Sequence, residues 1–104
     1  MAEQVVFSVL VLKIAERELE SVARELTQLL HRKGPTVPGL IEGTLLRGEV
    51  KTELWVITQW ASRHAWAVAR WDEDIARTLT DIVENRAVSS KIRVFDSIAN
   101  VGHS

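Results

Sequence analysis

The sequence contains no cysteine, no tyrosine and only two prolines. The absence of cysteine excludes disulfide bonds, thiolate metal sites and a cysteine nucleophile, and it favours a cytoplasmic location. Neither sign of charge is in clear excess, because 13 Lys and Arg residues stand against 14 Asp and Glu residues with no basic block. The electrostatic footprint of a nucleic-acid-binding protein is therefore missing, and we expect no nucleic-acid partner.

Long apolar runs and the common nucleotide or hydrolase motifs are also missing. The first apolar run, residues 5–12, is too short to cross a bilayer, and residues 1–4 lack the basic segment of a signal peptide. No glycine-rich phosphate loop, Gly-x-Ser-x-Gly motif or zinc motif occurs. We therefore expect no membrane association, no nucleotide-dependent chemistry and no serine-hydrolase chemistry.

What is present is the composition of a folded globular chain, with 46% hydrophobic and 26% charged residues in a length of 104. A chain of this length has room for one compact core. We expect a single domain over residues 1–104 whose stability benefits from a partner.

The spacing of apolar residues predicts the order of the elements. Residues 5–12 are rich in β-branched side chains and predict a buried strand, and residues 16–33 have the spacing and basic C-terminus of an amphipathic helix. Residues 40–47 and 52–61 predict two strands paired as a hairpin. Ser62 is the expected N-cap of a second helix through about Trp71, the acidic run 72–74 could begin a further helix, and residues 91–98 predict the last strand. Whether the helix bends at the acidic run is left open.

The resulting order, βαββαβ, is typical of the α+β ferredoxin-like fold with a four-stranded antiparallel sheet in the order 4-1-3-2. The two presumed central strands, residues 5–12 and 54–60, are apolar on both faces. Because the helices of this fold cover only one face, a second subunit is the expected cover of the other. We therefore predict a homodimer or a larger homo-oligomer.

Three short segments carry a resemblance to a known family: Pro38-Gly39-Leu40, Gln59-Trp60-Ala61-Ser62 and Ala65-Trp66. They resemble the antibiotic biosynthesis monooxygenase family of dimeric α+β barrels, in which a Pro-Gly strand opening precedes a Trp-x-Ser junction between the third strand and the second helix. The element order matches over nearly the whole chain. The resemblance implies a homodimer and, as in the cofactor-independent members, oxidation of polycyclic phenols or quinols.

The resemblance also implies which residues border a pocket between sheet and helices. Trp60 and Trp66 match the pocket aromatics of the cofactor-independent members, whereas Val56 stands where those members have a pocket Asn. Haem-degrading relatives use an Asn on the first strand and an axial His on a later helix. The corresponding segments here, residues 9–11 and 77–80, contain neither.

The residue pattern predicts the same location, between sheet and helices, independently of the family resemblance. Strand alternation places Trp60 with Val56 and Thr58, and helical spacing places Trp66 beside Ala65, so both rings are expected between sheet and helices. There they either line a pocket for a flat aromatic ligand or form plain core. Ser8 and Thr58 are polar side chains of the central strands and are either ligand donors or satisfied core hydroxyls. Trp55 is expected at an interface on the opposite face, and Trp71 is expected to be exposed or covered by a partner.

Candidates for catalysis are few. His64 is a possible general base, although its position off the inward helix face favours solvation. Arg70, one turn after Trp66, could reach the pocket mouth and pair with a phenolate or carboxylate, or it could be a surface residue paired with Asp74. His31 belongs to a basic helix end, His103 to the C-terminal tail, and residues 72–74 to a solvated helix start. No spacing suits a metal site, so none is expected.

Three hypotheses of function follow. The first is a small monooxygenase that uses no metal or flavin and acts on an electron-rich, quinol-like aromatic, whose own carbanion reduces dioxygen. The second is a non-catalytic module of the same fold that binds an aromatic ligand or a protein partner, which the loss of the pocket Asn favours. The third and weakest is a haem-binding protein that uses an unusual ligand such as His64.

Overall fold

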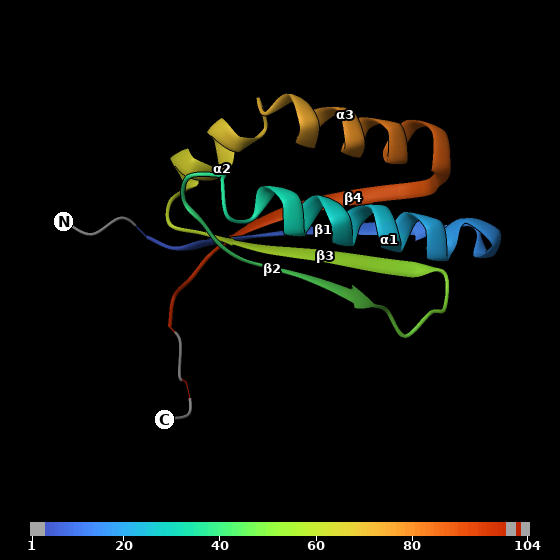
Figure 1. Cartoon of the computed structure of the whole chain (residues 1–104). Helices are drawn as coiled ribbons and strands as arrows, with labels where there is room; N and C mark the ends of the chain where they lie inside the picture. The colour runs from blue at the N-terminus through green and yellow to red at the C-terminus, as the bar shows by residue number, and fades with distance from the viewer. Residues whose placement is uncertain (1–3, 100–101, 103–104) are drawn as a thin grey trace.

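The alternation of apolar residues along the strands produces one antiparallel sheet. A computed structural model describes residues 4–99 and Gly102, and Figure 1 shows its elements. They are β1 (Val6–Ile14), α1 (Glu16–Lys33), β2 (Leu40–Arg47), β3 (Glu53–Trp60), α2 (Arg63–Ala69), α3 (Glu73–Asp81), the π-helical turn η1 (Ile82–Arg86) and β4 (Ala87–Asp96). The strand order β2-β3-β1-β4 is the predicted order read from the other edge, so the ferredoxin-like α+β fold is confirmed.

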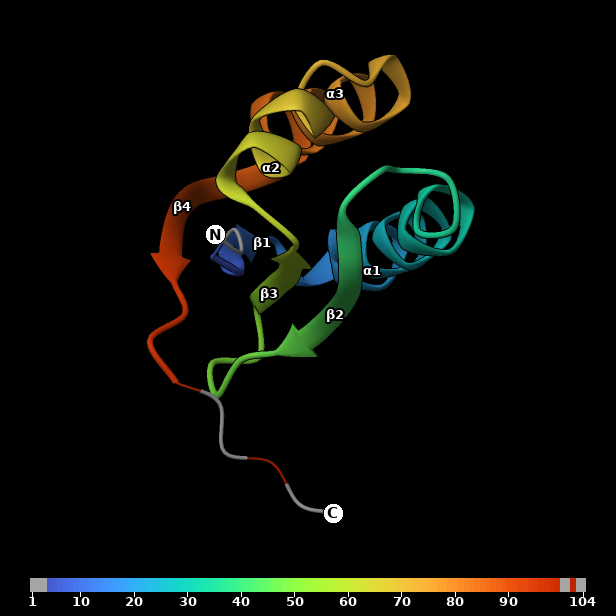
Figure 2. The ribbon, with the colours of Figure 1, turned by 90° about the vertical axis from the view of Figure 1, so that its left-hand side faces the viewer.

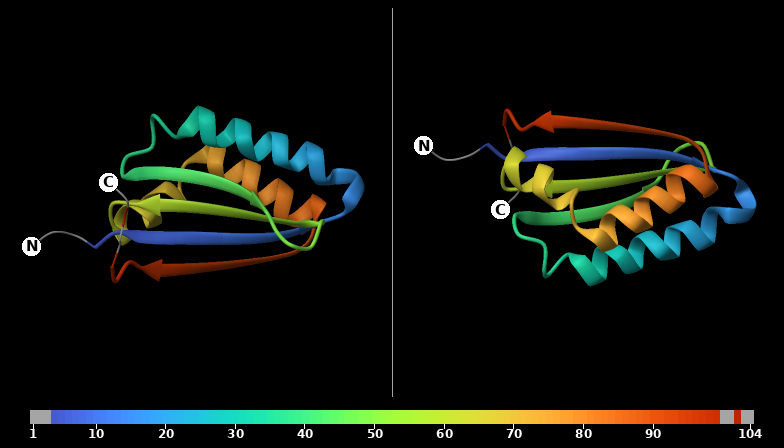
Figure 3. Two further views of the ribbon diagram at one scale, coloured as in Figure 1. Left: turned by 90° about the horizontal axis from the view of Figure 1, so that it is seen from below. Right: turned by 90° about the horizontal axis from the view of Figure 1, so that it is seen from above.

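The three helices lie on one face of the sheet, as the views from the side and from above show (Figures 2 and 3). Between sheet and helices, Leu12 and Ile14 of β1 meet Val22 and Leu26 of α1 and Ile82 of η1, and all five side chains are almost completely buried. Full burial of a side chain of this size stabilises the fold by roughly 1.5–3 kcal/mol. The helical spacing of α1 and the two-residue alternation of β1 thus converge on one core.

A tight turn connects α1 to β2. Pro38 and Gly39 occupy the central positions, Leu40 N donates to Val37 O at 3.3 Å, and Gly39 has φ +81°, which is the pattern of a type II turn. Gly39 O also accepts from Ala61 N at 2.7 Å. A Cβ on Gly39 would lie 2.4 Å from the Cβ of Ala65. The turn is therefore pressed against α2 at a point where only glycine fits.

Side-chain caps set the limits of the two short helices. Ser62 Oγ accepts from Ala65 N at 3.0 Å, which confirms Ser62 as the N-cap of α2. Asp72 has extended backbone, and its carboxylate accepts from Asp74 N and Ile75 N. The chain therefore breaks after Ala69, and the acidic run begins a separate helix, α3.

Two elements near the C-terminus differ from the prediction. β4 begins at Ala87, four residues before the predicted start at residue 91, because β1 continues to Ile14 and pairs with Ala87 beyond a register shift. Before β4, η1 buries Ile82 completely and directs Arg86 back to α1. There Arg86 forms ion pairs with Glu18 and Glu25 and donates to Ser21 Oγ at 2.7 Å. Sequence spacing alone did not predict this turn.

The second face of the sheet carries no helix among the described residues, as the view from below shows (Figure 3). Strand register assigns the following side chains to this open face: Phe7, Val9 and Val11 of β1, Trp55 and Ile57 of β3, Leu46 of β2 and Phe95 of β4. Trp55 is 36% exposed and Phe95 49% exposed. The prediction of a sheet that is apolar on both faces is confirmed, as is the place of Trp55 on the face away from the helices.

Two further expectations concern the chain as a whole. Within residues 4–99 and Gly102, no helix has the length and apolar character needed to cross a bilayer. His103, which the sequence assigned to the tail, lies outside the described residues.

Candidate functional site

A cavity of about 340 Å³ lies between the sheet and all three helices. Its floor is the helix-facing side of the two central strands, and its walls are the apolar faces of α1, α2 and α3. The floor residues are Ser8, Leu10, Val56, Thr58 and Trp60, and the wall residues include Leu26, Leu29, Leu30, Trp66, Ala69, Ile75 and Leu79. The lining is mostly apolar, which is the usual character of a pocket for a small organic molecule.

Trp60 and Trp66 come together at this cavity from different elements. Trp60 ends β3 and is buried, Trp66 lies in the middle of α2 and is half-buried, and both belong to one apolar cluster with Ala69. Both rings thus face the space between sheet and helices, as strand and helix periodicity predicts. Their role in binding a ligand stays a prediction.

The cavity floor presents hydroxyl groups to its interior. Trp60 Nε1 donates to Thr58 Oγ1 at 2.8 Å, so the only donor of this indole is used and the Thr58 proton is left to point elsewhere. Ser8 is the register partner of Thr58 on β1 and is 5% exposed. Val56, two residues before Thr58, adds no polar group. Two neighbouring hydroxyls on an apolar floor can donate to one ligand oxygen and stabilise it when it is negatively charged.

The helices add polar groups at the rim. Lys33 of α1, Arg70 at the end of α2 and Thr80 of α3 all line the cavity. The Arg70 guanidinium lies 5.1 Å from the centroid of the Trp66 ring, which is a cation–π contact. The alternative pairing of Arg70 with Asp74 is wrong, because the Asp74 carboxylate binds Arg32 through two contacts of 2.7 and 3.0 Å.

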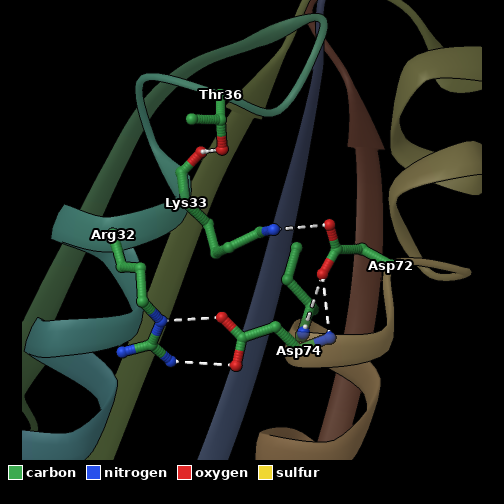
Figure 4. A network of polar contacts seen from close by, with 6 residues as sticks. Arg32, Lys33, Thr36, Asp72 and Asp74 are labelled. Carbon is green, nitrogen blue, oxygen red and sulfur yellow. Dashed lines mark hydrogen bonds and ion pairs between the residues drawn. The ribbon is translucent and has the colours of Figure 1, made fainter.

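Two ion pairs join the C-terminal end of α1 to the start of α3, and Figure 4 shows both. Arg32 binds Asp74, and Lys33 Nζ lies 2.7 Å from Asp72 Oδ2. Thr36 Oγ1 donates to Lys33 O at 3.1 Å and holds the chain that follows α1. We call Arg32–Asp74 and Lys33–Asp72 the α1–α3 ion pairs. Because Lys33 also lines the cavity, these pairs border its rim.

The α1–α3 ion pairs favour the ionised carboxylates. The hydrogen bond from Lys33, followed by the backbone N–H of Ile75, lowers the pKa of Asp72 below its ordinary value. The hydrogen bond from Arg32 lowers the pKa of Asp74, and the same bond raises the pKa of Arg32. The prediction that residues 72–74 begin a helix is confirmed, because Asp72 caps α3 and Glu73 and Asp74 lie in its first turn. In addition, Asp72 and Asp74 bind cations of α1, which the sequence did not predict.

The histidines lie apart from the cavity. His64 is exposed on α2 and His31 is exposed on α1, and neither lines the cavity. In the part of the chain that the structure describes, no group of three His, Asp or Glu residues has the arrangement of a metal site. The position of His64 gives no support to its use as a base or a haem ligand at this cavity.

Lys33 and Thr80 were not predicted from the sequence as rim residues. A signal for Lys33 was present, because residues 26, 29, 30 and 33 follow one helix face and the first three are leucines that line the cavity. Thr80 follows Leu79 and Ala76 in the same way on α3. In both cases a polar residue continues an apolar stripe at the end of a helix.

Comparison with known proteins supports the fold. No protein-family model matches the sequence, and no curated protein matches it. A solved structure from Caulobacter crescentus, provisionally assigned as an antibiotic biosynthesis monooxygenase, superimposes with a TM-score of 0.82 at 15% identity over 93% of this chain and 92% of its own. A second protein with the same provisional assignment, from Nitrosomonas europaea, gives 0.80 at 12% identity over 98% of each chain.

A haem-degrading protein from Mycobacterium tuberculosis has the same architecture, with a TM-score of 0.73 at 17% identity over 97% of this chain and 99% of its own. The chain thus has the fold of the antibiotic biosynthesis monooxygenases, as the short motifs predicted. That fold serves more than one chemistry, so the activity of this protein has to be argued from its own site.

Proposed function

We propose that this chain is a small monooxygenase-type enzyme that oxidises an electron-rich, quinol-like aromatic in the cavity between sheet and helices without a metal or flavin. The observation that carries the proposal is the lining itself: Trp60 and Trp66 offer flat apolar surfaces, and Ser8 and Thr58 offer donors on the floor. This donor set suits a phenolic ring with one oxygen on the floor, and the lining contains no His, Asp or Glu that would hold a metal ion.

The proposed reaction requires few catalytic groups from the protein. Ser8 and Thr58 donate to the phenolic oxygen and stabilise the deprotonated substrate, whose carbanion gives electrons to dioxygen and forms a C–O bond. In an anthrone-type substrate, loss of the second proton from that carbon with cleavage of the O–O bond then converts its CH₂ group and one O₂ into a carbonyl group and water. An apolar cavity assists because charge stabilisation is stronger where water is excluded.

The test is oxygen-dependent turnover of a panel of hydroquinones and anthrones, with oxygen uptake and product mass as readouts. We expect Trp60→Leu, Trp66→Leu and Thr58→Val to lower kcat/KM by tenfold or more, which corresponds to about 1.4 kcal/mol of transition-state stabilisation. Trp71→Leu is the matched control for the tryptophans, since Trp71 is 87% exposed. Thr27→Ala is the control for the hydroxyl, because exposed Thr27 bonds only to its own helix at Ala23 O.

Identical products with and without oxygen, or cavity variants as active as the controls, would reject the enzyme. The second candidate is then the non-catalytic aromatic-binding module. Val56 favours it, because this floor position carries no polar group where a quinol-oxidising cavity profits from one. Retention of an aromatic ligand without turnover, weakened by Trp60→Leu and not by Trp71→Leu, selects this candidate.

The proposal includes a homodimer formed through the open face, in the cytoplasm that the lack of cysteine favours. Apolar side chains occupy the centre of that face, and charges of opposite sign flank it: Lys91 and Arg93 lie at the β4 edge, and Glu42 lies on β2. A two-fold axis parallel to the strands would place the basic edge of one copy over the acidic edge of the other.

The dimer has a matched test. Leu46 lies on the open face and is 45% exposed, and Val68 lies on α2 and is 51% exposed. We expect Leu46→Asp to shift the protein towards monomer in sedimentation at micromolar concentration, whereas Val68→Asp leaves the mass unchanged. A monomeric parent protein, or equal effects of the two variants, would reject the dimer through this face.

A further inference from the structure

The charged side chains that line the cavity are all positive. Lys33 and Arg70 border it, and none of its lining residues is acidic. Arg70 precedes the Lys33 partner Asp72 by two residues, so the two cations border the same end of the cavity. Both cations are carried by the helical side of the cavity, whereas the hydroxyls of Ser8 and Thr58 are carried by the sheet.

The two cations differ in how their charge is balanced. Lys33 is paired with Asp72 at 2.7 Å. In contrast, no carboxylate of the described residues lies within ion-pair distance of the Arg70 guanidinium. The Trp66 ring, 5.1 Å from the guanidinium carbon, holds Arg70 in place without neutralising it.

Arg70 also lies between the cavity and solvent. Arg70, Ala76 and Thr80 line the cavity and also a shallow hollow on the outer side of α2 and α3. Glu73 and Asp81 lie in that outer hollow, and neither is paired with Arg70. Arg70 is exposed and lines both spaces, so its guanidinium lies between the cavity and solvent without a carboxylate partner among the described residues.

We propose that the aromatic ligand of this cavity carries an acidic group, a carboxylate or its equivalent, and that Arg70 selects the ligand by pairing with that group at the rim. The inference rests on the proposed function, because it takes an aromatic occupant as its starting point. A guanidinium matches the planar geometry of a carboxylate and forms two parallel charged hydrogen bonds with it. The phenolic end of the ligand then lies on the floor at Ser8 and Thr58, and its acidic end lies at the rim.

The experiment compares two probes that share one ring system, naphthol and hydroxynaphthoic acid, by calorimetric titration of the full chain at neutral pH. We expect the acid to bind about tenfold more tightly than naphthol, a ratio within the range of a charged hydrogen-bonded pair. Arg70→Gln should weaken binding of the acid far more than binding of naphthol, so that the ratio of the two affinities falls to about one. Arg70→Lys should keep part of the preference, because it keeps the charge and loses the planar fork.

Arg24→Gln is the matched control, because Arg24 is exposed on α1 and its replacement changes the net charge equally. Raising the salt concentration should weaken binding of the acid and leave naphthol unaffected, a response that a purely structural role of Arg70 would not give. Equal affinities for the two probes, or a preference for the acid that persists in Arg70→Gln, would overturn the inference. The proposal that the cavity binds an aromatic ligand would not be affected by either result. If neither probe binds, the proposed function is overturned together with it.

Discussion

Replacement of Gly39 by alanine should destabilise the protein for two separable reasons. The backbone at Gly39 has φ +81°, a region that costs an L-residue about 1–2 kcal/mol. The added Cβ would also lie 2.4 Å from the Ala65 Cβ, and such overpacking costs typically 1–3 kcal/mol. The substitution also stabilises the protein by about 0.4–1 kcal/mol, because alanine leaves the unfolded chain less backbone freedom than glycine does. We therefore expect a net loss of about 1–4.5 kcal/mol from these terms.

The steric part can be isolated with Ala65→Gly. This change removes the opposing Cβ at a cost of about 1 kcal/mol for glycine in a helix. In urea denaturation followed by circular dichroism at one fixed protein concentration, the double variant should be more stable than the sum of the single variants by about 1–3 kcal/mol. Gly102→Ala is the control, because a Cβ on Gly102 would meet no atom within 4 Å. A loss below about 0.5 kcal/mol for Gly39→Ala, or strict additivity with Ala65→Gly, would refute the reasoning.

Three further predictions concern the polar contacts of the helices. Ser62→Ala should cost about 1 kcal/mol of unfolding free energy through loss of the α2 cap, and Ser62→Asp should restore most of it. Arg86→Met should cost about 1–2 kcal/mol, because it leaves Ser21 and two glutamates of α1 without their common partner, whereas Arg24→Met should have almost no effect. The α1–α3 ion pairs should weaken as pH falls below the ordinary aspartate value of 3.8, since the lowered pKa values of Asp72 and Asp74 mean that the unfolded chain binds protons first. Asp72→Asn/Asp74→Asn should therefore flatten the dependence of stability on pH between about pH 5 and 2, and an unchanged slope in acid denaturation would contradict this assignment.

The local sequence pattern was sufficient to predict where an element begins and ends when contacts within that element determine its ends. The predicted helix over residues 16–33 and the predicted strand over residues 40–47 agree with α1 and β2 to the residue. Ser62 was identified as a cap because its hydroxyl acts within one turn. The meeting of Trp60 with Trp66 also followed from periodicity, because each element's inward face is set by its own spacing.

Contacts between segments that are far apart in the sequence could not be predicted from the local pattern. A pairing of Arg70 with Asp74 requires a continuous helix, in which residues four apart are neighbours, and the sequence left open whether the helix bends at the acidic run. The chain instead breaks at Asp72, which turns Asp74 towards Arg32 of α1 and leaves Arg70 over Trp66. The start of β4 was missed because Ser89 and Ser90 resemble a loop, and only pairing with the far end of β1 makes this segment a strand.

The four tryptophans divide the molecule into separately observable regions. Trp60 is buried, Trp66 is half-buried beneath a cation, Trp55 lies on the open face with Nε1 bonded to Glu53, and Trp71 is surrounded by solvent. With no tyrosine in the chain, its near-ultraviolet emission comes almost wholly from these indoles. Variants that keep a single tryptophan would therefore report on the cavity floor, the cavity wall, the open face or the outer surface one at a time. Occupation of the cavity and association of two copies would then be visible as distinct spectral changes in one protein without any attached dye.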